Sequence, residues 1–298
     1  MKKEEFFRSL KSIETENIID RVFYRPLGFR IAWSLKTTRI TPNAITIISI
    51  FVGMAAGIFF YFPYNISFAL LGILALISAN TLDCVDGQLA RLTGIKSEIG
   101  RILDGLAGDI WFACIYLAFA FRLNAQFDTW IFFVVVVVSG YSHILQAAIT
   151  DYYKTLHLFF ISKDKGREFE SHHDVKERYE KMKPGVSKFF SYFYIGYTKK
   201  QEKMTPQLQS LLQLLRKNYG RDIPENIRVA FRKKSKRLMP MIDLLTFNGR
   251  SIVLFISVIA NILWLYLFYE IVVLNIVRYT IIHKHENICK SFYKELFL

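Results

Sequence analysis

Six runs of mostly apolar residues constrain the fold of this chain more than any other feature. Each is close to the ~20 apolar residues that a helix needs to cross a lipid bilayer. We therefore expect an all-α integral membrane protein, built as a bundle of about six transmembrane helices. The runs extend over about residues 44–62, 66–82, 99–121, 130–149, 241–259 and 262–282.

Composition narrows the class of protein further. Of the 298 residues, 52% are hydrophobic and 16% are aromatic, yet the formal net charge is +14. A chain this apolar is not an ordinary soluble domain. We therefore expect its Lys and Arg side chains to contact the anionic headgroups of membrane lipids and anionic substrates, and we expect no nucleic-acid partner.

The distribution of basic residues predicts how the helices cross the membrane. Lys and Arg are frequent before residue 40, around Arg91 and after residue 150, whereas the links at residues 63–65 and 122–129 together hold only Arg122. Loops that are rich in Lys and Arg stay in the cytoplasm. The sequence thus predicts a protein of the inner (cytoplasmic) membrane, with the helix ends near Arg91 and an active site there facing the cytoplasm.

Four segments follow from these patterns. Residues 1–41 alternate charged with aromatic and aliphatic side chains, which is typical of an amphipathic helix at the membrane interface. Residues 42–150 hold the first four spans, and residues 241–298 hold the last two and a C-terminal tail. In residues 151–240 the basic side chains outnumber the acidic ones roughly two to one, so we interpret this segment as a basic cytoplasmic insertion.

Local patterns predict where some helices begin and end. Thr41 followed by Pro42 is typical of an N-cap residue and the first residue of a helix. The leucines between Pro206 and Leu215 recur at the spacing of an amphipathic helix. A tight turn near Asn261 is needed to fit two spans into the last apolar region.

Four aspartates lie near the junction of the second and third apolar runs, where ionisable groups are costly and usually mark a function. On a helix, Asp83 and Asp86 share one face with Gly87 and Ala90. Asp104, on the next span, can add a third carboxylate. Carboxylate oxygens are ligands that Mg²⁺ and Mn²⁺ prefer, and the small side chains leave room for a bulky ligand. These residues indicate a metal site for phosphates.

The same residues form a longer pattern with fixed spacing. Asp83-x-x-Asp86-Gly87-x-x-Ala90-Arg91, followed after eight residues by Gly100-x-x-x-Asp104, resembles the signature of the CDP-alcohol phosphatidyltransferase family. The resemblance implies a membrane enzyme, usually a homodimer. Such an enzyme transfers a phosphate-linked group from a CDP-linked lipid donor, such as CDP-diacylglycerol, to an alcohol acceptor and releases CMP.

The resemblance also implies roles for individual residues. It implies two divalent cations, Mg²⁺ or Mn²⁺, held by Asp83, Asp86, Asp104 and a fourth aspartate. By position, the residues that lie against the cytidine diphosphate are Gly87, Ala90 and Arg91, with Asp83 beside them.

The chain departs from the family pattern at this fourth aspartate. The pattern places it four residues after Asp104, where this chain has Gly108, and the aspartate follows one place later as Asp109. A step of five residues leaves the helix face that a step of four keeps. Because the fourth carboxylate is the family's metal ligand and general base, Asp109, with Asp104, is the expected catalytic residue.

Three interpretations of this departure stay open. A π-bulge near Gly105 and Gly108 can bring Asp109 back into line with Asp104. Alternatively, a different base, or one supplied by the substrate, takes its place. In the third interpretation the chain is a catalytically silent relative that binds lipids or nucleotides.

The surplus of basic residues mildly favours a phosphorylated acceptor such as inositol phosphate.

Arg250 is a weaker candidate in the fifth apolar run. If the helix is continuous, Asp243 and Arg250 lie two turns apart on roughly one face. A guanidinium near the cytoplasmic end of a span can bind phosphate through two hydrogen bonds, which makes Arg250 a candidate contact for an acceptor phosphate. An ion pair with Asp243 is an equally supported alternative.

Overall fold

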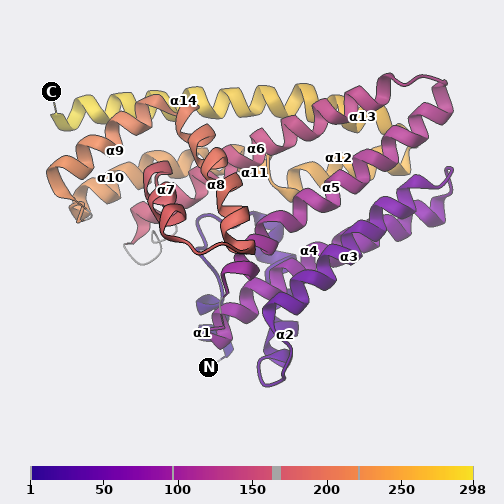
Figure 1. Ribbon diagram of the computed structural model, residues 1–298, viewed down its shortest axis with the longest axis horizontal. Coiled ribbons are helices and arrows are strands. Elements are labelled where there is room, and N and C mark those ends of the chain that lie inside the picture. Colours follow the sequence, from indigo (N-terminus) through magenta and orange to yellow (C-terminus); the bar gives the residue numbers. More distant parts are fainter. Residues whose placement is uncertain (1, 96, 163–168, 221, 298) are drawn as a thin grey trace. The chain divides into compact units, whose positions relative to one another are not determined.

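The computed structural model describes residues 2–95, 97–162, 169–220 and 222–297, and every regular element in these ranges is a helix (Figure 1). The chain forms two compact units, each built from two separate segments. Unit 1 consists of Met1–Ile144 and Phe247–Val273, and unit 2 consists of Leu145–Thr246 and Leu274–Leu298.

Six stretches of helix are long and apolar enough to cross a membrane, which confirms the prediction of an all-α integral membrane protein. Two boundaries differ from the prediction. The fourth helix does not end near residue 149 but continues to Ile161, because a helix can extend beyond its apolar part. The fifth stretch, Glu225–Ile259, begins before residue 241 and contains a turn, after which its last helix begins at Phe247. The stretches are Pro42–Tyr61, Ile66–Thr93, Ile99–Phe127, Ile131–Ile161, Glu225–Ile259 and Leu263–Leu296.

Three long helices form the centre of unit 1: α3 (Pro42–Tyr61), α4 (Ile66–Thr93) and α5 (Glu98–Phe127). Helix α3 packs along both α4 and α5 (Figure 1). Its Gly53 makes the close approach to α5 possible, since a Cβ atom there would overlap the Trp111 ring. Small residues let transmembrane helices pack closely in this way.

The predicted helix start and turn are confirmed in unit 1. Thr41 caps α3, because its side-chain oxygen accepts a hydrogen bond from the backbone N–H of Ala44 (3.3 Å), and Pro42 is the first helical residue. After α12 (Phe247–Ile259) the chain turns at Asn261, which adopts a left-handed conformation with φ 56°. Helix α13 (Leu263–Phe268) and the π-helix η3 (Tyr269–Val273) follow.

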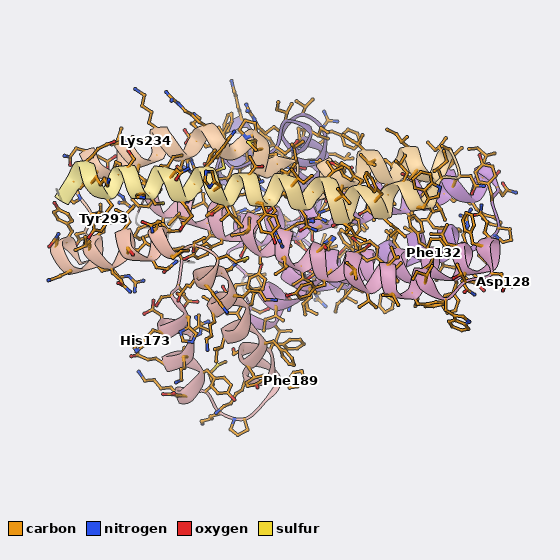
Figure 2. The ribbon with its side chains drawn as sticks, turned by 90° about the horizontal axis from the view of Figure 1, so that it is seen from above. Asp128, Phe132, His173, Phe189, Lys234 and Tyr293 are labelled. Carbon is orange, nitrogen blue, oxygen red and sulfur yellow. The ribbon has the colours of Figure 1, made fainter. Side chains whose placement is uncertain are left out.

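Unit 1 also includes the first part of another long helix, α6 (Ile131–Ile161), as far as Ile144. Asp128 makes the turn before it, in a left-handed conformation with φ 49°. Asp128 and Phe132 mark this end of the α5–α6 pair in Figure 2.

The N-terminal segment of unit 1 forms α1 (Lys2–Arg8), the π-helix η1 (Asp20–Tyr24) and α2 (Arg25–Leu35). Helix α2 packs on α4, and Ala32 is fully buried there. Ile18 and Val22 remain 74% and 75% exposed. One side of this segment therefore covers α4, and its position at a membrane interface stays a prediction.

Unit 2 contains the end of α6, α14 (Leu274–Phe297) and shorter elements between them. The predicted amphipathic helix is confirmed as α9 (Pro206–Tyr219), which packs on α14 and buries Leu208, Leu211, Leu212 and Leu215. His173 on α7 and Phe189 on α8 are labelled in Figure 2. The shorter elements besides α9 are α7 (His172–Lys181), α8 (Val186–Lys203), α10 (Glu225–Ser235), η2 (Lys236–Leu238) and α11 (Met239–Asp243).

Candidate active site

Three carboxylates come together between α4 and α5. One carboxylate oxygen from each of Asp83, Asp86 and Asp104 lies within 4.8 Å of the other two. Helix α4 is regular through Asp83 and Asp86, so both side chains occupy the same face, as their spacing predicts. Asp86 is 3% exposed, whereas Asp104 is exposed, so the group extends from the packed helix core to an accessible surface.

The buried member of the group is held by a residue that the sequence did not point to. Thr46, on α3, donates a hydrogen bond from Oγ1 to Oδ2 of Asp86 (2.5 Å), and Thr46 is itself 2% exposed. This bond holds the Asp86 carboxylate in one orientation. A threonine forty positions away in the sequence carries no signal of this role, because only the packing of α3 on α4 brings it there.

Helix α5 is positioned by a second contact with α3. Ser97 caps α5 by accepting a hydrogen bond from the Gly100 N–H (2.9 Å). The Ser97 hydroxyl also lies 2.9 Å from Nδ2 of Asn43, next to Pro42 at the start of α3. A Cβ atom at Gly100 would overlap Oδ1 of Asn43. This glycine therefore lets the two helix ends meet, which sets the position of Asp104 one turn further along α5.

Arg91 lies over the bare surface of Gly87. A Cβ atom built on Gly87 would be 3.1 Å from Nη2 of Arg91. The Nε atom of Arg91 donates a hydrogen bond to the backbone carbonyl of Ser9, in the N-terminal segment. Within the described ranges, its Nη1 and Nη2 groups form no hydrogen bond. The Nη1 and Nη2 groups, which form the fork of the guanidinium, are therefore oriented by the protein and open to an anion.

Asp109 does not belong to the acidic group among the residues that the structure describes. Helix α5 is α-helical from Glu98 to Phe127, so the first of the three interpretations, in which a π-bulge realigns Asp109 with Asp104, is wrong. On a regular helix, five residues correspond to a rotation of about 140° beyond one full turn. The carboxylate instead lies beside His143 of α6, with 3.6 Å between Oδ1 and Nε2.

His143 connects Asp109 with a buried ion pair. Arg250 pairs with Glu270 of η3, and its Nη1 lies 3.0 Å from Nδ1 of His143. Because a guanidinium can only donate, Nδ1 must accept, and the proton of a neutral His143 is on Nε2, facing Asp109. The Tyr266 hydroxyl donates to the other oxygen of Glu270 (3.1 Å). With Tyr116, whose hydroxyl lies 3.1 Å from Nδ1 of His143, these side chains form a polar network that extends from the buried ion pair to the partly exposed Asp109.

The structure also corrects the expectation for Arg250. The assumption of one continuous helix from Asp243 to Arg250 is wrong, because α11 ends at Asp243 and α12 begins at Phe247. Asp243 forms an ion pair with Lys154 (2.8 Å). Arg250 is 2% exposed and paired with Glu270, so its geometry gives no support to a contact with an acceptor phosphate.

The chemistry of the acidic group fits a divalent cation. Three carboxylates whose oxygens lie within 4.8 Å repel one another unless a positive charge is placed among them. Their oxygens are hard ligands of the type that Mg²⁺ and Mn²⁺ prefer, and the exposed side at Asp104 leaves positions for substrate or water oxygens. Asp83, Asp86 and Asp104 therefore could hold such a cation, with Thr46 orienting Asp86.

Comparisons with known proteins agree with this geometry. The family description "CDP-alcohol phosphatidyltransferase" matches residues 39–164, a range that includes the whole acidic group. Archaetidylinositol phosphate synthase from Pyrococcus horikoshii is 41% identical over 75 residues, which are 25% of this chain and 38% of that relative. The match thus covers less than half of the relative's length. Residues 39–164, which include Asp83, Asp86 and Asp104, are therefore similar to the CDP-alcohol phosphatidyltransferase family.

Proposed function

We propose that this protein transfers a phosphatidyl, or another phospho-alcohol, group from a CDP-linked donor such as CDP-diacylglycerol to an alcohol and releases CMP. The observation that carries the proposal is the group of three carboxylates beside the bare Gly87 surface and the open fork of Arg91. A binding site for a diphosphate needs two components: carboxylates that hold a cation, and a guanidinium that binds phosphate oxygens.

Asp83, Asp86 and Asp104 would hold two divalent cations, Mg²⁺ or Mn²⁺, which supply positive charge to the donor's diphosphate and to the departing CMP. The chain's own residues bind and orient the donor. Gly87 and Ala90 let the diphosphate approach the backbone of α4, and Arg91 donates hydrogen bonds to its phosphate oxygens.

The proton of the attacking hydroxyl needs an acceptor. Asp109 and Asp104 are the two carboxylates proposed for this step, and the position of Asp109 beside His143 favours Asp104, which is exposed. An acceptor that carries a phosphate can also take the proton itself. In either case the hydroxyl displaces CMP at the β-phosphorus without a covalent enzyme intermediate.

A phosphorylated polyol such as inositol phosphate is the acceptor that we propose. The printed name of the relative, archaetidylinositol phosphate synthase, and the +14 net charge of the chain support this choice. We further propose that the protein works as a homodimer in the inner membrane with its active site on the cytoplasmic side, where Lys and Arg are concentrated. Its partners are then lipids and the two substrates, and not nucleic acid.

The proposal is tested by incubating the purified protein in detergent with CDP-diacylglycerol, Mg²⁺ or Mn²⁺ and a panel of alcohols, and by measuring the CMP released. We expect release that requires both the metal and one acceptor, with inositol phosphate more active than unphosphorylated inositol. No release with any alcohol or CDP-linked donor would favour the alternative, a catalytically silent membrane protein that binds lipids or nucleotides.

A further inference from the structure

The N-terminal segment holds a second arginine that packs on α4 beside Gln88. Arg25 is the first residue of α2, and its Nε donates a hydrogen bond to Oε2 of Glu16 (2.9 Å). Its side chain is 18% exposed. Within the described ranges, the Nη1 and Nη2 groups of Arg25 form no hydrogen bond. Like Arg91, Arg25 is thus held by Nε while its fork remains open.

The backbone of Arg25 is hydrogen-bonded directly to α4. Gln88, which follows Gly87, donates hydrogen bonds from Nε2 to the Arg25 carbonyl (3.2 Å) and to Oγ of Ser9 (3.0 Å). Gln88 is fully buried. The Ser9 carbonyl also accepts the hydrogen bond from Arg91. The Gln88 side chain therefore links Arg25 to Ser9, and through Ser9 to Arg91.

The turn before Arg25 is also held in place. Asp20–Tyr24 is a π-helix, which is rare and often occurs at functional sites. Asp20 accepts a hydrogen bond from Nδ2 of Asn248 (2.8 Å), and Tyr24 is 4% exposed. Burial, followed by the charge of Asp20, raises the pKa of Tyr24 to about 12. Several contacts therefore fix the position at which the Arg25 side chain leaves the backbone.

The charges around Arg25 indicate what it can bind. Arg25 and Arg91 are linked through Gln88 and Ser9, which holds the two guanidinium groups in the same part of unit 1. Two guanidinium groups that are held near each other repel, so an anion that contacts both is favoured. A diphosphate has enough oxygens to accept hydrogen bonds from two such forks at once.

We propose that Arg25 and Arg91 together bind the diphosphate of the CDP-linked donor, so that the N-terminal segment is part of the donor site. This inference rests on the proposed function, because it assigns the ligand of the same site. Gln88 acts as a positioning residue for both arginines. The ligand class is a nucleoside diphosphate, whether free or linked to a lipid.

The test compares four variants with the wild-type protein. Arg25→Ala removes the proposed phosphate contact, and Arg25→Lys keeps the charge but not the fork. Glu16→Gln removes the ion pair and keeps Arg25. Arg30→Ala is the matched control, because Arg30 is an exposed arginine on the same helix. The donor KM and kcat are measured with CDP-diacylglycerol, CDP binding is measured by calorimetry with Mg²⁺, and thermal unfolding shows whether each variant is folded.

We expect Arg25→Ala to raise the donor KM and to weaken CDP binding about tenfold or more, with a smaller change in kcat. Arg25→Lys should recover part of this loss, and Arg30→Ala should stay within about twofold of wild type. Glu16→Gln, which weakens the contact that holds Arg25, should raise the donor KM less than Arg25→Ala does. Equal effects of Arg25→Ala and Glu16→Gln would overturn the inference, because they would show that Arg25 only forms an ion pair.

The two proposals fail in different ways. If the wild-type protein releases no CMP, the transferase is contradicted, and CDP binding to Arg25→Ala still decides the role of Arg25. If the wild-type protein is active and Arg25→Ala binds CDP as Arg30→Ala does, only the role of Arg25 is contradicted.

Discussion

At the scale of single residues, the acidic group depends on side chains that hold it in position. Thr46 donates to Oδ2 of Asp86 at 2.5 Å, and such residues behind a metal ligand typically change metal affinity by roughly 10–100-fold when they are mutated. We predict a decrease of this size for Thr46→Val, measured as the Mg²⁺ concentration that gives half-maximal CMP release. Ser49→Ala, which removes a buried hydroxyl one turn away on the same helix, is the control and should have little effect.

Gly108 gives a second test at this scale. Apart from the chain neighbours and the backbone of α5 itself, no heavy atom of the described residues lies within 4 Å of a Cβ atom built on Gly108 or on Gly105, so an aspartate fits at either position. An aspartate at 108 lies four residues after Asp104 and shares its face, whereas one at 105 does not. We predict that Gly108→Asp raises kcat for an unphosphorylated alcohol and that Gly105→Asp does not. Equal kcat values in the two variants and the wild type would show that this carboxylate position does not limit the reaction.

At the scale of secondary-structure elements, the site depends on the close packing of α3 on α5. Gly53 faces the Trp111 ring, where a larger side chain forces the helices apart. Overpacking typically costs about 1–3 kcal/mol, so we predict that Gly53→Val lowers the temperature of thermal unfolding and the rate of CMP release. Gly140→Ala is the control, since its Cβ would meet the Tyr116 ring at an ordinary 3.9 Å. A Gly53→Val protein as stable as this control would contradict the packing described here.

The ion pair between α12 and η3 gives another prediction for the elements. Arg250 and Glu270 are 2% and 0% exposed, and removing one partner of a buried pair typically costs about 3–5 kcal/mol. We predict that Glu270→Gln unfolds at a much lower temperature than the wild type. The double variant Arg250→Met/Glu270→Met should unfold at a higher temperature than Glu270→Gln, because no charge is left buried. If the double variant unfolded at a lower temperature than Glu270→Gln, the unpaired buried charge of Arg250 would not be the cause of the lost stability.

The elements also show how far sequence reasoning can reach. The six spans, the Thr41 cap and the shared face of Asp83 and Asp86 were predictable, because apolar length, capping chemistry and helical spacing are local properties. The bond from Asn43 to Ser97 joins residues that are 54 positions apart, so it depends on packing. The turn after Asp243 has no proline or glycine to mark it, and this is why Arg250 was assigned to the wrong helix face.

At the scale of the whole molecule, the chain combines six apolar helical stretches with a group of carboxylates that would be costly in a membrane without a ligand. The similarity of residues 39–164 to the CDP-alcohol phosphatidyltransferase family and the geometry of Asp83, Asp86 and Asp104 lead to the same proposal, a transferase that depends on divalent metal. The N-terminal segment adds Arg25 to this site from outside the matched range. The central claim is that the three carboxylates bind the metal.

The most direct test of this claim is Mn²⁺ binding to the purified protein, measured by electron paramagnetic resonance in the presence of CDP. We predict up to two bound Mn²⁺ ions per chain in the wild type. We expect a clear loss of bound Mn²⁺ in Asp83→Asn, Asp86→Asn and Asp104→Asn, and no loss in the control Asp128→Asn, whose side chain lies at the α5–α6 turn. Mn²⁺ binding that is unchanged in all three site variants would contradict the assignment of these carboxylates as metal ligands.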